Sequence, residues 1–357
     1  MSESSTKPHV VFAVPGSLET PTGGYVYDRR VIAELRRQGW HVDIVSLSER
    51  FPDPDMSALV SAYTAIAMMA PGTPLVVDGL ALGAMPDIGQ HLKPSTPLVA
   101  LVHHPLAMET GLLPDRAAAL RASEYRALKA ARHVVTTSAT TASVLSFDYG
   151  VPDDAITVVS PGTDPAPLAN GSADDRVALL SVGAVTRRKG HDLLLAALAM
   201  IKHLPWHIDI VGDLTRDPAA VAHLRNSIPY LGLEERVRLR GAVSGEDLEA
   251  AYDAADIFVL ASYYEGYGMV FAEAIARGLP VIGTTGGAIP EAVPKGSGLL
   301  VPPGDLVALV GALRDMIDSH EIRERYRAGA RQAAQSLPRW EQAGAQFARV
   351  LGAVVAG

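Results

Sequence analysis

The chain has 357 residues, of which 48% are hydrophobic and 20% are charged, and its formal net charge is -8 at pH 7. This length exceeds one ordinary domain and suits two, and the acidic balance argues against a general nucleic-acid binder, whose phosphate contacts need a basic surface. The absence of cysteine excludes disulfides, thiolate catalysis and cysteine-ligated zinc, and it fits a reducing compartment.

The N-terminal segment Met1–Pro8 is polar and lacks the apolar core of a signal peptide. No apolar run approaches the length that a bilayer requires. The helix expected around Arg116–Arg132 mixes cations with Asp115 and Glu124, which indicates a solvated face and not a lipid-binding one. We therefore expect a soluble, cytoplasmic protein without a transmembrane segment, and peripheral membrane contact is possible but not indicated.

The chain opens with a predicted strand at His9–Pro15, an apolar run rich in β-branched residues. A glycine-rich loop, Gly16–Gly24, leads into a predicted helix from Tyr25 to Gln38, and Val42–Leu47 predicts a returning strand. This order forms a βαβ unit, which implies a parallel sheet. Further strands are predicted at 74–78, 97–103, 133–138 and 156–160, with a helix at 114–131.

The segment Pro165–Asp175 combines proline, glycine and polar residues without a period, which predicts a linker. Predicted strands then alternate with helices again, at 177–182, 207–211, 237–240, 257–261, 280–283 and 299–301. We predict an α/β protein of two Rossmann-like, doubly wound parallel-sheet domains facing a central cleft. The expected boundaries are 1–165, 176–337 and a C-terminal helix, 338–357, packing back toward the N-terminal domain.

The stretch Ser262–Glu273 carries the strongest indication of function. Gly266 and Gly268 turn the backbone sharply between a predicted strand and a predicted helix. The first amides of a helix lack partners within it and its dipole is positive there, so this turn can hold a phosphate. Glu265 and Glu273 flank it, and carboxylates beside a phosphate are favourable where they accept hydrogen bonds from sugar hydroxyls. The pattern indicates a ligand with both phosphate and sugar.

A second glycine loop, Gly183–Gly190, follows the predicted strand at 177–182 and contains Arg187, Arg188 and Lys189. Alone, three cations in a row indicate a solvated loop; after a strand and a glycine they indicate a phosphate clamp.

These segments together resemble the retaining family 4 glycosyltransferases, which have the GT-B fold. Glu265–Glu273 resembles the family's pair of glutamates separated by seven residues, and Gly183–His191 resembles its glycine loop with basic clamp. Gly286–Glu291 is similar to the family's glycine turn before Pro-Glu, and Thr22–Gly24 to its N-terminal glycine motif. The resemblance covers nearly the whole chain and is densest in the second half.

The resemblance implies a hexosyltransferase that takes its sugar from a nucleotide diphosphate sugar, UDP- or GDP-linked, held mainly by the C-terminal domain. Glu265 would lie by the donor sugar, Glu273 would bind ribose hydroxyls, and Lys189 would neutralise the departing diphosphate. The remaining donor-binding positions that the resemblance implies are Gly23, Gly24, Gly183, Arg188, Gly268, Met269, Val270 and Glu291. Neither a cofactor nor a metal is implied, and no Asp-x-Asp pair is placed to hold a metal.

The acceptor side is less readable. The resemblance places a histidine near the reacting sugar carbon, and His103 matches that position better than His104 because it directly follows the apolar run. Adjacent residues of a strand point opposite ways, so we expect at most one of the two to face the ligand. Glu109 is a candidate acceptor carboxylate and equally a solvated loop residue. The acceptor would be a glycan, a lipid-linked molecule or a small molecule.

The chain departs from the family pattern at one position. Ala184 stands where the family usually has arginine, so Arg187 or Arg188 would have to supply that cation.

Two other functions fit the predicted fold. A glycoside phosphorylase would bind inorganic phosphate in the diphosphate site. A dinucleotide-binding protein would need G-x-G-x-x-G, and neither Val14–Gly16 nor Val182–Ala184 begins that pattern.

Overall fold

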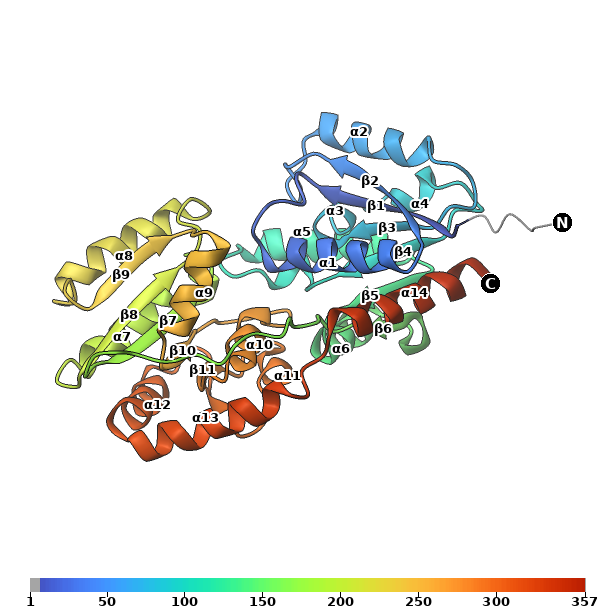
Figure 1. Ribbon diagram of the computed structural model, residues 1–357. Coiled ribbons are helices and arrows are strands. Elements are labelled where there is room, and N and C mark those ends of the chain that lie inside the picture. Colours follow the sequence, from blue (N-terminus) through green and yellow to red (C-terminus); the bar gives the residue numbers. More distant parts are fainter. Residues whose placement is uncertain (1–6, 357) are drawn as a thin grey trace. The chain divides into compact units, whose positions relative to one another are not determined.

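A computed structural model describes residues 7–356, so the polar residues 1–6 behind the signal-peptide expectation lie outside the described part of the chain. The chain divides into two compact units (Figure 1). Unit 1 comprises residues up to Gly162 together with Pro338 onward, and unit 2 comprises Thr163–Leu337. Among the described residues, no helix is both long and apolar enough to cross a membrane.

Unit 1 is built on a six-stranded parallel sheet in the order β2-β1-β3-β4-β5-β6. Its strands are β1 (His9–Pro15), β2 (His41–Leu47), β3 (Leu75–Asp78), β4 (Leu98–Val102), β5 (His133–Thr136) and β6 (Ile156–Val158). Its helices are α1 (Gly23–Arg37), α2 (Met56–Ala67), α3 (Gly79–Leu82), α4 (Ile88–His91), α5 (Pro114–Leu128), α6 (Ala139–Tyr149) and α14 (Trp340–Ala356).

The two faces of this sheet bury different helices. Alternate residues of β1 point to opposite faces, so Val11 and Ala13 pack with apolar residues of α2, α5 and α6, whereas Phe12 meets Phe347 of α14. Helices α1 and α14 also pack against each other, although almost the whole chain separates them in sequence. The last helix therefore completes the core of the first unit.

Unit 2 repeats the architecture with the strand order β12-β11-β10-β7-β8-β9, again all parallel. Its strands are β7 (Val177–Val182), β8 (Trp206–Val211), β9 (Val237–Gly241), β10 (Ile257–Val259), β11 (Val281–Thr284) and β12 (Gly298–Val301). Its helices are α7 (His191–Met200), α8 (Pro218–Tyr230), α9 (Gly245–Asp253), α10 (Met269–Ala276), α11 (Ile289–Ala292), α12 (Leu306–Asp318) and α13 (His320–Ala334).

The strand order of unit 2 reverses between β7 and β10. In open parallel sheets, ligands bind outside the carboxyl ends of the strands at such a reversal. The two glycine loops, Gly183–Gly190 after β7 and Ser262–Gly268 after β10, both lie at this point. The fold thus brings together the two segments that carry the main indication of function.

Two boundaries differ from the sequence-based expectation. The segment 165–175, expected as a linker, belongs to unit 2 and is held to it by backbone hydrogen bonds. The amide of Ala169 donates to the Arg277 carbonyl, and the amide of Gly171 donates to the Asp253 carbonyl. Helix α1 begins at Gly23 and not at Tyr25, because the side chain of Thr22 caps its first turn by accepting from the Tyr25 amide.

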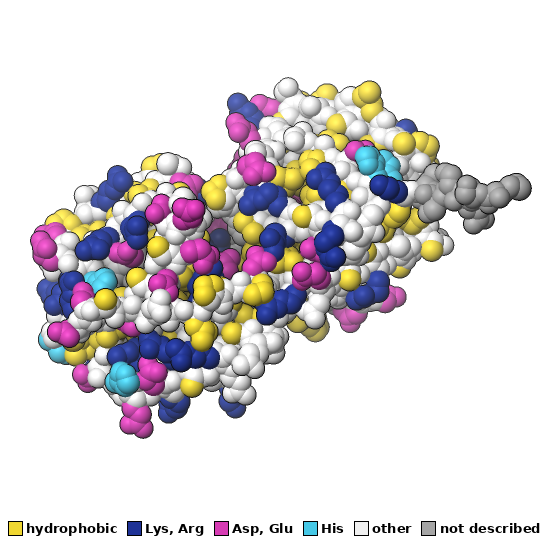
Figure 2. Space-filling view, in the orientation of Figure 1, with side chains coloured by type: hydrophobic (Ala, Val, Ile, Leu, Met, Phe, Trp, Pro, Cys, Tyr) yellow, Lys and Arg dark blue, Asp and Glu magenta, His cyan; other side chains and the backbone are white. Residues whose placement is uncertain are grey.

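Basic and acidic side chains are interspersed over the face of the molecule that Figure 2 presents. Such mixing accords with a chain that holds 31 basic and 39 acidic residues.

Candidate active site

The turn after β10 is fixed to the neighbouring glycine turn. Glu265 forms a parallel bridge with Gly287, and the Ala288 amide donates to the Glu265 carbonyl at 2.9 Å. Gly287 has φ +62, and a Cβ there would overlap the Glu265 carbonyl oxygen. A glycine is therefore required at this contact, and it fixes the backbone from which the Glu265 side chain extends.

The Glu265 carboxylate is buried and surrounded by donors. It accepts hydrogen bonds from Lys189 Nζ at 2.6 Å, Arg188 Nη1 at 2.9 Å and Ser262 Oγ at 2.6 Å. Burial alone would raise its pKa, but the charges of Lys189 and Arg188 outweigh that effect and lower the pKa to about 2. Near neutral pH Glu265 is thus a charged group that pairs with two cations.

These cations come from the loop after β7. A short 3-10 turn, Arg187–Lys189, is followed by Gly190, whose φ of +64 and close approach to the Ala261 carbonyl admit no side chain. The loop is fastened to the other turn because the Tyr263 amide donates to the Arg188 carbonyl at 2.8 Å. Gly183 leaves room beside the Lys189 side chain.

The loop also answers which arginine lies at the site. Arg188 reaches both the Glu265 carboxylate and the Tyr264 carbonyl, the latter at 2.8 Å. Arg187 is exposed, and its amide donates to Asp217. Of the two arginines, Arg188 is the one whose side chain contacts Glu265, and its role in place of the family arginine stays a prediction.

Helix α10 begins at the same turn. Its N-cap is Gly268, in the left-handed conformation, and no side chain caps the first turn, which contains Met269 and Val270. One turn further, Glu273 accepts a hydrogen bond from the Tyr252 hydroxyl at 3.1 Å, and burial raises the pKa of its carboxyl group. The helix therefore presents amides at its start and a buried carboxyl group on its side.

Glu291 comes from a third segment of unit 2, after the Gly286–Gly287 turn. It is exposed in the first turn of α11, the short helix that follows the Gly286–Gly287 turn. Its charge raises the pKa of Tyr267, secondary to the effect of burial.

In unit 1, His103 directly follows β4 and lies against two buried carboxylates. Its Nε2 is 3.1 Å from Asp28 Oδ1 and 3.5 Å from Asp78 Oδ2. His104 has its Nε2 3.6 Å from Glu109 Oε2 instead, so the two adjacent histidines have separate environments. Gly24 lies against the His103 ring, where a Cβ would come 3.2 Å from Cδ2, whereas Gly23 has open space.

Sequence reasoning did not foresee the burial of four polar residues near these positions. For one of them, Glu124, the expectation of a solvated face was wrong, because its side chain is buried against the segment that contains Leu106. Asp28 and Asp78 are buried beside His103, and His191, the first residue of α7, is buried with no hydrogen-bond partner in the described structure for either ring nitrogen. Burial lowers the pKa of His191 to about 3, with the Lys189 charge adding to the effect. Glu124 accepts from the Leu106 amide at 3.1 Å, and burial raises its pKa to about 7.

The position of Asp78 could have been found, since an aspartate ending an apolar strand before a glycine points to the carboxyl edge of a sheet. The other three give no such signal.

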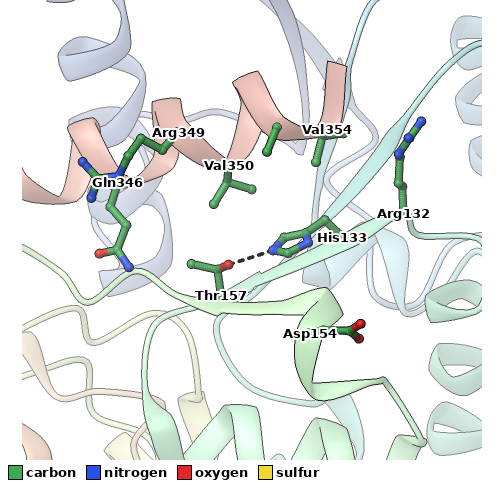
Figure 3. A pocket seen from close by; sticks show the side chains of 9 residues that line it. Arg132, His133, Asp154, Thr157, Gln346, Arg349, Val350 and Val354 are labelled. Carbon is green, nitrogen blue, oxygen red and sulfur yellow. Dashed lines mark hydrogen bonds between the residues drawn. The ribbon is translucent and has the colours of Figure 1, made fainter. Parts of the chain in front are cut away.

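A pocket of about 490 Å³ lies elsewhere in unit 1, beneath α14 (Figure 3). His133 begins β5, and its Nε2 is hydrogen-bonded to Oγ1 of Thr157 in β6 at 2.8 Å. Arg132 and Asp154, which also line the pocket, precede these two strands. The pocket is therefore at the amino ends of the strands, opposite the edge that carries His103. None of the predicted site residues lines it.

The comparisons with known proteins agree with this architecture. Two units, each with a parallel six-stranded sheet and flanking helices, are the architecture of the GT-B class of proteins. Residues 166–333 match the family described as "Glycosyl transferases group 1", and residues 22–167 match "Glycosyltransferase Family 4". The chain belongs to this family of glycosyltransferases.

Curated relatives share part of their length with the chain. It is 31% identical over 272 residues to a D-inositol 3-phosphate glycosyltransferase from Catenulispora acidiphila, covering 69% of this chain and 64% of that protein. It is 29% identical over 180 residues to a mannosylfructose-phosphate synthase from Agrobacterium fabrum, covering 46% and 40%. The chain thus spans less than two thirds of the length of these two relatives.

Solved structures establish the GT-B fold. A sucrose-phosphate synthase from Thermosynechococcus elongatus superposes with a TM-score of 0.80 at 22% identity, covering 97% of this chain and 99% of that one. Anabaena Alr3699/HepE, in complex with UDP and glucose, gives a TM-score of 0.77 at 19% identity, covering 97% and 100%.

Proposed function

We propose that this protein is a retaining glycosyltransferase that moves a hexosyl group from a nucleotide diphosphate sugar to an acceptor hydroxyl without a metal ion. The observation that carries the proposal is the buried cluster of Glu265, Lys189 and Arg188 at the turn that leads into α10. Two ordered cations beside an uncapped helix start would attract an anion, and the carboxyl groups on either side suit sugar hydroxyls.

The donor would bind to unit 2. Its diphosphate would lie on the amides of Gly268, Met269 and Val270 and on the two cations, and its ribose would hydrogen-bond to Glu273. The Tyr252 hydroxyl donates a hydrogen bond to Oε2 of Glu273, and Oε1 has no hydrogen-bond partner among the described residues. That oxygen supports the ribose assignment, because a carboxylate can accept from two hydroxyls. The solved HepE complex, of the same fold, holds UDP.

Glu265 would act first as a counter-ion and then, once the donor is bound, as a hydrogen-bond acceptor. Without ligand it is the counter-ion that holds Lys189 and Arg188 in place at 2.6 and 2.9 Å. When a diphosphate binds, Lys189 and Arg188 would contact it as well as Glu265. The two side chains would already be in position, so binding would require no rearrangement of them. Glu265 would then be left beside the donor sugar as a hydrogen-bond acceptor.

The reaction would break the bond between the anomeric carbon and the β-phosphate oxygen. The acceptor oxygen would bond to that carbon on the same face, and the acceptor proton would pass to the released diphosphate. Lys189 and Arg188 would stabilise the negative charge that develops on the leaving group. Since these two side chains supply the positive charge, the proposal requires no divalent cation.

A thermal-shift screen of the purified protein against UDP, GDP, ADP, dTDP and NAD tests the donor site. We expect one nucleoside diphosphate to stabilise the protein, because a ligand that binds only the folded state raises its stability by mass action. Lys189→Ala and Glu273→Ala should abolish that shift. Lys202→Ala is the matched control, because the Lys202 ammonium is exposed and donates a hydrogen bond to the Leu231 carbonyl, away from the site residues.

The other outcomes would contradict the proposal. A response to inorganic phosphate alone, with breakdown of a disaccharide by phosphate, would identify a phosphorylase. A response to NAD alone would identify a dinucleotide-binding protein. A folded protein that responds to no nucleotide would contradict the donor site.

A further inference from the structure

The Asp28–Asp78–His103 cluster brings three elements of unit 1 to one point. Asp28 comes from α1, Asp78 is the last residue of β3, and His103 directly follows β4. Both carboxylates approach the same ring nitrogen, Nε2, at 3.1 and 3.5 Å. The Asp28 and Asp78 side chains are 0% and 2% exposed, and the His103 side chain is 17% exposed. The histidine is thus the part of the cluster that reaches the surface.

The ring is also fixed on its other sides. The Tyr27 ring meets it edge-on, with centroids 5.3 Å apart at 81°, and Gly24 lies close to Cδ2. The hydroxyls of Thr137 and Thr141 donate to the His103 carbonyl at 3.4 and 3.5 Å. Backbone and ring are both held, and Nδ1 has no hydrogen-bond partner among the described residues.

Charge balance decides the protonation of this ring. Two carboxylates buried together are unfavourable unless a cation accompanies them. The charged or titratable groups around His103 are Asp28, Asp78 and Tyr27, with Arg29 acting through Asp28. His103 is the one base in contact with both carboxylates in the described structure, so the imidazolium form supplies the compensating charge.

We propose that Asp28 and Asp78 are positioning residues that keep His103 doubly protonated, so that its Nδ1–H donates a hydrogen bond to an oxygen of the sugar substrate. Neutral imidazole with its proton on Nε2 would offer Nδ1 only as an acceptor. The carboxylates would therefore select the donor character of the exposed nitrogen. The substrate part of this inference rests on the function proposed above, whereas the charge on the ring does not.

The electrostatic effects on the two partners agree with the geometry. Burial alone would lower the pKa of His103, but Asp28 and Asp78 outweigh it and raise the pKa to about 10. Because the folded pKa lies above the unfolded one of about 6.5, the stabilisation is complete below pH 6.5 and is lost as the pH rises toward 10. Burial raises the pKa of Asp28 to about 6, against the opposing effect of His103.

Histidine NMR on the full-length, ligand-free protein tests the charge state independently of any activity. The His103 ring signals would be assigned in ¹⁵N-histidine-labelled protein as those lost in His103→Gln. We expect both ring nitrogens to remain protonated through pH 8. A ring that titrates near the ordinary value of about 6.5 would overturn the proposal.

Variants then test the carboxylates. Asp28→Asn should lower the pH at which the His103 ring is half-titrated by about one unit or more, and Asp78→Asn should also lower it. Asp43→Asn is the matched control, because it removes a carboxylate 2.9 Å from His9 at an exposed position. If Asp28→Asn does not fold, the titration of His103 in the wild type and in Asp78→Asn still tests the proposal. Unchanged midpoints in folded variants would overturn the proposal.

Two further readouts separate the alternatives. A His103 signal that shifts with one equivalent of Zn²⁺ or Mn²⁺ would identify a cation site and overturn the proposal. In donor-hydrolysis assays, Asp28→Asn should lose about tenfold in kcat at pH 8 and recover toward pH 6, since protonation would restore the Nδ1–H. A loss of equal size at both pH values would overturn the positioning role.

If no donor is hydrolysed by the wild type, the proposed transferase function fails and the NMR result on the ring charge still stands.

Discussion

At the scale of single residues, the account depends on buried charges that are fully compensated. Glu265 is 6% exposed and accepts hydrogen bonds from three side chains, two of them cationic. Removing one member of a buried ion pair leaves the other without compensation, and this costs more than the pair contributes when both are present. The cluster should therefore be both a ligand site and a support for the fold of unit 2.

Glu265→Gln should lower the free energy of unfolding by about 3–5 kcal/mol, because Lys189 and Arg188 would lose their buried counter-ion. Denaturant unfolding near pH 7 measures this. Asp53→Asn is the control, since Asp53 pairs with Arg116 at an exposed position and surface pairs contribute little. An equal effect of both changes would contradict the account.

The same variant has a pH signature. The pKa of Glu265 is lowered from 4.5 to about 2, so its contribution to stability is complete above pH 4.5 and is lost as the pH falls through 2. The difference in unfolding free energy between wild type and Glu265→Gln should shrink between those values. A constant difference would contradict the ion-pair explanation.

Some of these residues could be predicted from the sequence and others could not. Glu265, Lys189 and Arg188 could be selected because each lies next to a glycine turn after an apolar strand. Asp28 could not, because it lies in a helix before Arg29 and Arg30, where the sequence suggests a solvated face. Its burial depends on β3 and β4 lying beside β1, which is a property of the sheet order and not of the local sequence.

At the scale of elements, the glycine turns determine the site. The strands were predicted well because apolar runs between glycine and proline give a strong local signal. Helix α2 was not identified in advance, because its twelve residues contain no charged side chain to mark a solvated face. The contact between the Gly190 loop and Ala261 could not be predicted either, since it joins segments that meet only through the pairing of β7 with β10.

Gly190→Ala should destabilise unit 2 and abolish nucleotide binding. Gly190 and Gly232 have nearly the same backbone conformation, φ +64 and +65, so alanine carries a similar conformational cost at each. A Cβ at Gly190 would overlap the Ala261 carbonyl, whereas at Gly232 the nearest atom is Lys202 Nζ at 3.6 Å. We expect Gly190→Ala to cost at least about 2 kcal/mol more than Gly232→Ala by thermal unfolding. Equal costs would contradict this description of the loop.

At the scale of the whole molecule, the chain forms two units with the same architecture, and its last helix belongs to the first of them. Phe347 of α14 is fully buried, with its ring centroid 5.7 Å from that of Phe12. Helix α14 is thus part of the core beneath α1, the helix that carries Asp28. The C-terminal segment therefore contributes to the position of residues near the start of the chain.

Phe347→Ala should lower the unfolding free energy of unit 1 by about 3–5 kcal/mol, because it leaves a cavity against Phe12. Val355→Ala, on the same helix at a position 55% exposed, should change it by less than about 0.5 kcal/mol. Hydrogen exchange can assign the loss to unit 1, since its amides would exchange faster while those of unit 2 would not. Equal protection in both units would contradict this assignment.

The most direct test of the central claim is the anomer of the sugar released from a nucleotide diphosphate sugar in the absence of acceptor. The protein would be incubated with UDP- and GDP-hexoses, with EDTA present, and the first product observed by ¹H NMR before mutarotation. The account predicts slow release of the hexose in the anomeric configuration of the donor, together with the nucleoside diphosphate, and no release by Lys189→Ala. Release of the inverted anomer, or release that requires a divalent cation, would contradict it.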